Sequence, residues 1–332
     1  MITDRMEMGC LRLRPLFVFA VLLCAIIGGA AADTASPKQT YNVVLSYDVF
    51  LGGILAGTVD LNVARIGQDY DISSVSRSHG LLDFLIELRR QNGVSGRIEA
   101  DRTYPNSYKT TGQWAGNNRS VQITYTGGAG GAEANEPKND VSFIAHPNAE
   151  DDEREVVPVT YLPGTKDPFS AMFEAVLRNE MAGSCAGSVK VFDGRRRYDL
   201  QAQSVGKVDA RAMANRDRII SILPGFVNIC RITQNLIAGA SKKKWLPRLA
   251  RPKWTDIWLA KVRTELPALP VRLEADAGMG AMVARLVAIG GRRHLPGKGP
   301  NGRGPNGQTM DGQGNAEGAE DMLETILGNG QN

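Results

Sequence analysis

A strict alternation of apolar and polar residues near the start of the chain constrains its fold most. Val59, Leu61 and Val63 alternate with polar residues, and the stretch 43–51 repeats the same pattern. A period of two places one face of a strand on a core and the other in water, as in an antiparallel sheet. Because Gly52-Gly53 separates the two stretches, they are predicted to form a β-hairpin.

Similar short stretches recur along most of the chain. Further strands are predicted over residues 70–75, 92–99, 104–113, 119–126, 140–145, 187–192, 195–205, 217–223, 227–235, 255–262, 269–275 and 279–288. A hydrophobic content of 42% is sufficient for a folded core and excludes a wholly disordered chain. The predicted fold class is therefore mainly β (α+β), with a curved antiparallel sheet packed around one or two helices.

One segment in the middle of the chain has a helical rather than a strand pattern. Asp167 is a favourable N-cap, and Pro168 suits the first helical position. The apolar side chains that follow with helical spacing are Phe169, Met172, Phe173, Val176 and Leu177. This helix, which Gly183 ends, is expected to bury its apolar stripe against the concave face of the sheet.

A second apolar segment, residues 80–88, is too short and too uniformly apolar for a clear assignment. One interpretation is a helix of the core, and the other is a lid over a site for an apolar ligand. For the second interpretation, the predicted lining residues are Leu81, Leu82, Leu85, Phe169, Met172, Phe173 and Val176.

The N-terminal region has the features of a secretory signal peptide. Arg5, Arg12 and Arg14 precede an apolar run over residues 16–32 that ends in small residues. We expect cleavage after Ala32, although a retained membrane anchor is the alternative for a run of this length. The predicted organisation is a signal peptide (1–32), a leader (33–40), a β-rich domain (41–289) and a disordered Gly/Asn-rich tail (290–332).

Cleavage would leave Cys185 and Cys230 as the two cysteines of the mature chain. An even pair in an oxidising compartment predicts one structural disulfide. A redox-active pair is the alternative, but the two cysteines lack the C-x-x-C spacing that lowers a thiol pKa.

No pattern in the sequence indicates a catalytic or metal site. The three histidines are far apart, and neither H-E-x-x-H nor G-x-S-x-G occurs. We therefore expect no enzyme activity, no cofactor and no metal. A net charge of +4 without a dense basic face also does not indicate nucleic-acid binding.

The most prominent charge cluster begins at residue 242 and contains two tryptophans. The residues of this cluster that are candidates for contact with an anionic group are Lys242, Lys243, Lys244 and Arg248. Lysine, arginine and tryptophan together suit an anionic membrane surface. The alternative is an ordinary solvated loop whose tryptophans cover the edge of the core.

Several stretches in a fixed order carry a resemblance to a known family. They are residues 47–53, 56–57, 80–84, 164–171, 185–200, 257–259 and 269–273. Together they resemble the bacterial envelope family called domain of unknown function 3108, over about residues 41–289. The resemblance implies secretion and an antiparallel β-rich domain more than a reaction. The fold that this resemblance implies is similar to that of periplasmic half-barrels, which wrap a curved sheet around helices and carry lipids or lipoproteins.

Within the densest of these stretches, Asp193-Gly194 predicts a hairpin turn that is followed by three arginines. Arg195, Arg196 and Arg197 are candidate contacts for a carboxylate or phosphate head group. The alternative is turn chemistry followed by solvated arginines.

These features predict a non-enzymatic periplasmic protein that binds an apolar or amphiphilic, lipid-like ligand or an envelope component. A pocket of several hundred Å³ lined by the apolar residues above would support this function. The alternatives are a structural or assembly factor with a filled core, and an envelope hydrolase whose carboxylates meet across distant strands.

Overall fold

The computed structural model describes residues 40–80, 83, 87–114, 116–127, 140–213, 217–242, 254–276 and 281–291. The predicted signal peptide and most of the predicted leader and tail therefore lie outside the described residues. No helix among the described residues is long and apolar enough to cross a membrane.

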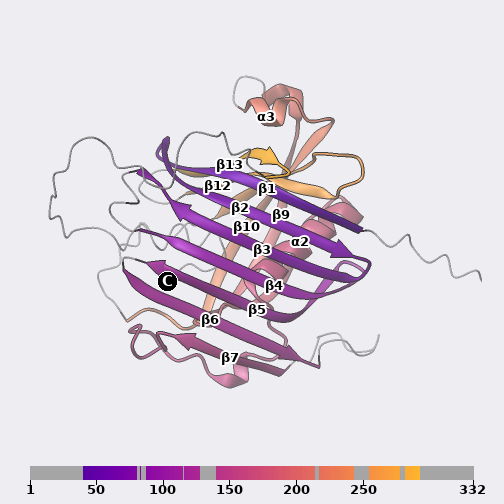
Figure 1. Cartoon of the computed structure of the whole chain (residues 1–332). Helices are drawn as coiled ribbons and strands as arrows, with labels where there is room; N and C mark the ends of the chain where they lie inside the picture. Colours follow the sequence, from indigo (N-terminus) through magenta and orange to yellow (C-terminus); the bar gives the residue numbers. More distant parts are fainter. Residues whose placement is uncertain are drawn as a thin grey trace, which may run out of the picture. The chain divides into compact units, whose positions relative to one another are not determined.

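Thirteen strands form one antiparallel sheet, which accounts for most of the described chain (Figure 1). The strands are β1 Thr40–Leu51, β2 Ile54–Ile66, β3 Asp69–Ser78, β4 Arg89–Glu99, β5 Arg102–Trp114, β6 Asn117–Thr126, β7 Asp140–His146, β8 Gly187–Phe192, β9 Arg197–Asp209, β10 Phe226–Ala238, β11 Thr255–Lys261, β12 Ala268–Asp276 and β13 Ala281–Ile289. Their order in the sheet is β7-β6-β5-β4-β3-β2-β1-β13-β12-β11-β10-β9-β8. The predicted mainly β fold is confirmed.

The predicted hairpin between the first two strands is also present. Leu51 of β1 pairs with Ile54 of β2 across Gly52 and Gly53. Both glycines have positive φ angles, 56° and 89°, which a two-residue type I′ turn requires and which side chains disfavour.

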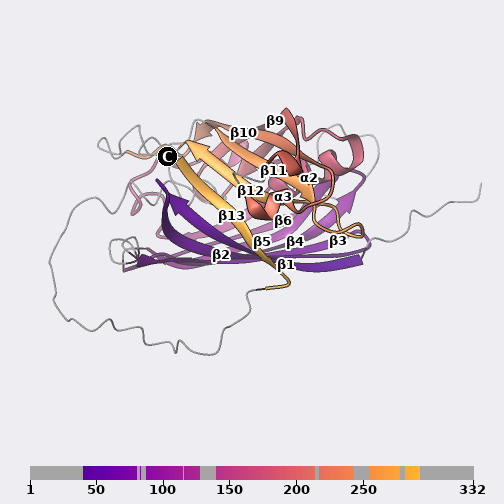
Figure 2. The same ribbon diagram turned by 90° about the horizontal axis from the view of Figure 1, so that it is seen from above.

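Consecutive strands pair as a meander on each side of one long-range pair, β1 with β13. The alternating apolar residues of β1, including Leu45 and Tyr47, are buried and point towards the core. Seen from above, β1–β5 lie on one side of helix α2 (Pro168–Ala182) and β9–β13 on the other (Figure 2). The sheet is open and curved, and its concave face holds α2.

Helix α2 begins and ends as the sequence predicts. The Asp167 carboxylate accepts a hydrogen bond from the Ser170 backbone N–H at 2.9 Å, and Pro168 is the first helical residue. Gly183 ends the helix with a φ of 67°, in the left-handed region that glycine tolerates.

The prediction of a strand over 217–223 is wrong. This segment contains the short helix α3 (Arg218–Ser221), because the Asp217 carboxylate accepts from the Ile220 N–H at 3.2 Å and so starts a helical turn. The structure also describes two 3₁₀ turns, η1 (Val159–Tyr161) and η2 (Ala210–Met213). Of the predicted second helix, Gly80 and Asp83 are helical, and most of its apolar residues lie outside the described part of the chain.

The two outermost strands of the sheet, β7 and β8, meet through side chains rather than through a ladder of hydrogen bonds. The Phe143 ring of β7 lies 4.8 Å from the Phe192 ring of β8, in an edge-to-face arrangement. A Cβ atom on Gly194, in the turn after β8, would lie 2.2 Å from a methyl carbon of Val121 on β6. Side-chain packing therefore holds the two ends of the sheet together.

Candidate ligand pocket

Helix α2 is fastened to the concave face by a buried polar cluster. The Glu174 carboxylate accepts hydrogen bonds from the Thr103 backbone N–H at 3.0 Å and from the Thr103 hydroxyl at 3.2 Å. It also forms ion pairs with Lys166 and Arg178. The Tyr70 hydroxyl and the Ser170 hydroxyl share a hydrogen bond of 2.6 Å. These contacts fix which side of α2 faces the sheet.

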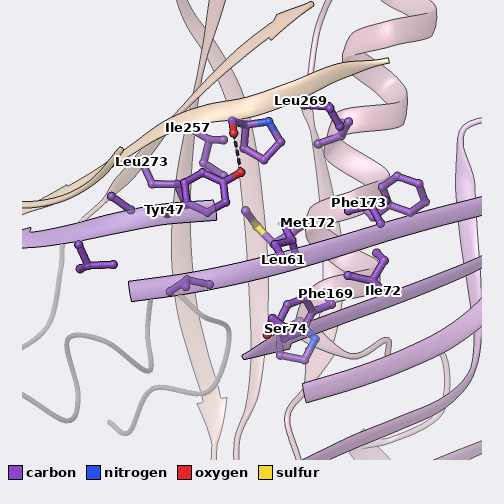
Figure 3. Close-up of a pocket in the computed structure, with 17 residues that line it drawn as sticks. Tyr47, Leu61, Ile72, Ser74, Phe169, Met172, Phe173, Ile257, Leu269 and Leu273 are labelled. Atoms are coloured by element: carbon purple, nitrogen blue, oxygen red, sulfur yellow. Dashed lines mark hydrogen bonds between the residues drawn. The ribbon is translucent and has the colours of Figure 1, made fainter. Parts of the chain in front are cut away.

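The side of α2 next to this cluster borders an apolar pocket of about 140 Å³ (Figure 3). Its wall combines α2 with inward-facing side chains from both halves of the sheet. The lining residues are Tyr47, Val49, Val59, Leu61, Val63, Ile72, Ser74, Pro168, Phe169, Met172, Phe173, Val176, Ile257, Leu269, Pro270, Leu273 and Ala284.

Among the described lining side chains, Tyr47 and Ser74 carry hydroxyl groups, and both already have hydrogen-bond partners. The Tyr47 hydroxyl donates to the Pro270 carbonyl oxygen at 2.6 Å, which is the dashed line in Figure 3. The Ser74 hydroxyl accepts from the Asn92 amide at 2.9 Å. Burial raises the pKa of Tyr47, so its hydroxyl keeps its proton. The pocket therefore presents a surface suited to apolar groups.

Sequence reasoning located one side of this pocket. Phe169, Met172, Phe173 and Val176 lie in its wall, and the other three predicted lining residues, Leu81, Leu82 and Leu85, lie outside the described residues. Ligand binding by these side chains stays a prediction. The strand residues of the wall were missed, although their period-two alternation could have indicated that they share the concave face.

The three candidate arginines for an anionic head group have partners within the protein. Arg195 donates to the His146 carbonyl oxygen at 3.0 Å and lies 3.4 Å from the Asp152 carboxylate. The Arg196 Nε atom donates to Asp193 at 2.9 Å, within the predicted turn. Arg197 donates to Asp199 at 2.7 Å. Arg195 therefore joins the β8–β9 turn to its surroundings, whereas the pairs of Arg196 and Arg197 lie within the turn and within β9.

The remaining charge predictions fall mostly on undescribed residues. Lys242 is exposed, whereas Lys243, Lys244 and Arg248 lie outside the described residues, so contact with an anionic surface stays a prediction. Among the residues that the structure describes, no three His, Cys, Asp or Glu side chains form a group that could hold a metal ion.

The predicted disulfide between Cys185 and Cys230 is confirmed, with a Cα–Cα distance of 6.2 Å. Cys185 lies between α2 and β8, and Cys230 lies in β10. Both residues are buried. The bond therefore joins the segment between α2 and β8 to β10, and β10 is two strands away from β8 in the sheet.

The buried N-cap of α2 makes the stability of the domain depend on pH. Burial raises the pKa of Asp167 from 3.8 to about 6, against the opposing effect of hydrogen bonds from Ser170. The pKa of Asp167 is higher in the folded protein than in the unfolded chain, so protonated Asp167 favours the folded state. This stabilisation is complete below about pH 4. It is lost as the pH rises through about 6.

Asp167→Asn keeps an N-cap oxygen but removes the titration. Relative to this variant, the wild-type protein is expected to lose about 3 kcal/mol of unfolding free energy between about pH 4 and pH 7. Urea unfolding of both proteins at intervals of one pH unit measures the difference. A difference that is constant with pH would contradict the assignment.

The fold and the pocket define a class of protein: a mainly β domain whose open, curved antiparallel sheet holds one helix and an apolar pocket on its concave side. The family model described as Protein of unknown function (DUF3108) matches residues 46–287, and the chain belongs to this family.

Among solved structures, one similar chain is a beta-barrel-like protein of domain of unknown function DUF1849 from Brucella abortus. It shares 12% sequence identity with a TM-score of 0.41, over 76% of this chain and 98% of that chain. Among curated proteins, no match is found.

Proposed function

We propose that this protein acts without catalysis in the periplasm and binds the apolar end of a small amphiphile between α2 and the concave face of the sheet. The observation that carries this proposal is the composition of the pocket wall, in which apolar side chains surround two polar groups with internal partners. A pocket with such a wall offers water few hydrogen-bond partners and so favours apolar groups.

The volume of the pocket is smaller than the several hundred Å³ expected from the sequence, and it limits what enters the pocket. A cavity of about 140 Å³ suits one small ring or a short segment of acyl chain. Pockets that enclose a whole drug-sized molecule start at about 300 Å³. The proposed ligand therefore places only its apolar end in the pocket, and its polar part lies outside.

The same volume favours one second candidate, a structural or assembly factor of the cell envelope with an essentially filled core. In that case the cavity is a packing defect, and the protein acts through its surface.

Native mass spectrometry of protein purified from the periplasm without detergent, followed by organic extraction, separates the two functions. Met172→Glu places a charge in the pocket wall. Met181→Glu makes the same change on the same helix at a residue that is 64% exposed. We expect a stoichiometric amphiphile with the wild-type protein and Met181→Glu, and an at least tenfold lower occupancy with Met172→Glu.

A wild-type protein that carries no ligand, and takes up none from extracted envelope lipids, would favour the assembly factor. The intact mass also tests secretion, because cleavage after Ala32 leaves a mature chain that starts at Asp33.

A further inference from the structure

A second groove, of about 600 Å³, crosses β3, β4, β5 and β6 and reaches His146 of β7. The pairing register of the strands shows on which face of the sheet this groove lies. Ser76 pairs with Val59 on one side and with Arg90 on the other, so these three side chains share one face. Val59 lines the pocket beside α2, and Ser76 and Arg90 are buried. Neighbouring residues along each strand therefore point to the outer face.

The walls of the outer groove are two rows of side chains that run across the strands on either side of the Ser76–Arg90 row. In one row Arg77 is opposite Arg89, which is opposite Gln113. The two rows are two residues apart along each strand, which is about 7 Å. In Figure 1 the four strands lie side by side in front of α2, so the groove opens away from the helix.

The groove is lined by four arginines: Arg77 and Arg89 are directly opposite each other on the outer face, whereas Arg90 and Arg119 belong to the inward-facing row between the two outer rows. Like charges at directly opposite positions destabilise a sheet. Glu87 lies 3.6 Å from Arg89, but both side chains are at least half exposed, so this pair offsets little of the repulsion. Arg77 has no carboxylate at ion-pair distance among the described residues, and the lining of the groove contains no acidic residue. An anion between the two guanidinium groups would relieve their repulsion.

The rest of the lining is rich in neutral hydrogen-bonding groups. Gln91 and Thr111 are opposite each other in the second row, and Gln113 and Asn118 continue the first. An amide side chain both donates and accepts, which suits the hydroxyl groups of a polyol. The groove is also larger than a single anion needs, and its volume falls within the usual range for small-molecule sites.

We propose that the outer groove binds a phosphate ester of a small polyol, with the phosphate between Arg77 and Arg89 and the hydroxyl groups along the amide side chains. A phosphate is favoured over a carboxylate because the two guanidinium groups of directly opposite arginines have more N–H donors than the two oxygens of one carboxylate satisfy. This site is separate from the pocket beside α2 and does not depend on its proposed ligand.

Isothermal titration calorimetry with glycerol 3-phosphate at low salt tests the site, with glycerol as the uncharged comparison. We expect saturable binding of the phosphate ester only. Arg77→Gln and Arg89→Gln should each weaken it at least tenfold, which is the loss of a charge-assisted contact. The matched control is Arg97→Gln on β4. Arg97 lies outside the groove, and its Nε atom lies 3.9 Å from the Asp69 carboxylate. It should change the affinity less than twofold.

Thermal unfolding gives a readout that a merely structural role would not move. Without ligand, Arg77→Gln should raise Tm by about 1–2 °C, because it removes the repulsion. Glycerol 3-phosphate should raise the Tm of the wild-type protein and of Arg97→Gln, but not that of Arg77→Gln.

Binding to lipid vesicles distinguishes two sources of the phosphate ester, a lipid head group and a free solute. If the wild-type protein binds phosphatidylglycerol vesicles but not phosphatidylcholine vesicles, and Arg77→Gln abolishes this binding, the source is a lipid head group. Binding of glycerol 3-phosphate without vesicle binding assigns a free solute instead. Failure to bind either probe, or an equal loss of affinity in Arg97→Gln, would overturn the proposal.

Discussion

Glu174→Ala is expected to lower the free energy of unfolding by about 3–5 kcal/mol. The carboxylate is buried and pairs with Lys166, which is itself only 6% exposed. Burial already lowers the pKa of Lys166, and Glu174 opposes this effect. Without Glu174, the ammonium group and the Thr103 N–H lose their buried acceptor.

Urea unfolding followed by circular dichroism measures this loss. Glu180→Gln is the matched control, because Glu180 lies on the same helix but pairs with the half-exposed Lys261, and it should cost about 1 kcal/mol or less. The double variant Lys166→Met/Glu174→Leu should recover part of the loss, since it removes the Lys166–Glu174 charge pair together but leaves Arg178 and the Thr103 N–H without their acceptor. Equal losses in Glu174→Ala and Glu180→Gln would contradict the importance of the buried pair.

Loss of the disulfide is expected to destabilise the domain by about 4 kcal/mol. The bond closes a loop with a sequence separation of 45 residues, and the chain-entropy model gives this value for a loop of that length. The variant is Cys185→Ala/Cys230→Ala, which leaves no unpaired thiol. Its unfolding midpoint in urea should fall well below that of the oxidised wild-type protein.

A reducing agent provides the internal comparison. It should lower the midpoint of the wild-type protein towards that of the double variant, and it should leave the double variant unchanged. A wild-type midpoint that does not respond to complete reduction would show that the bond adds no stability.

Local structure was largely predictable, because it depends on neighbouring residues. The Gly52-Gly53 turn follows from residues that tolerate positive φ angles, and the start of α2 follows from Asp167 and Pro168. The short helix α3 was mistaken for a strand, since an apolar run of this length has no distinctive period and the cap at Asp217 was overlooked.

The pocket could be predicted only in part, because its wall combines residues that are distant in the sequence. The helical spacing of Met172 and Phe173 indicates one apolar side, but it does not say which strands face it. The hydrogen bond from Tyr47 to Pro270 depends on how β1, β13 and β12 are ordered in the sheet. The Arg196–Asp193 pair in the turn and the Arg197–Asp199 pair at the start of β9 likewise depend on side-chain directions, which composition does not reveal.

The pairing of β1 with β13 also determines when the domain can be completed during synthesis. Leu45 pairs with Ile289, so the first strand made has to wait for the last one before both of its edges are covered. Pairings this distant in sequence form slowly, and an uncovered edge is prone to aggregation in the meantime. Stalled or truncated chains that end before Ala281 would keep this edge of β1 open.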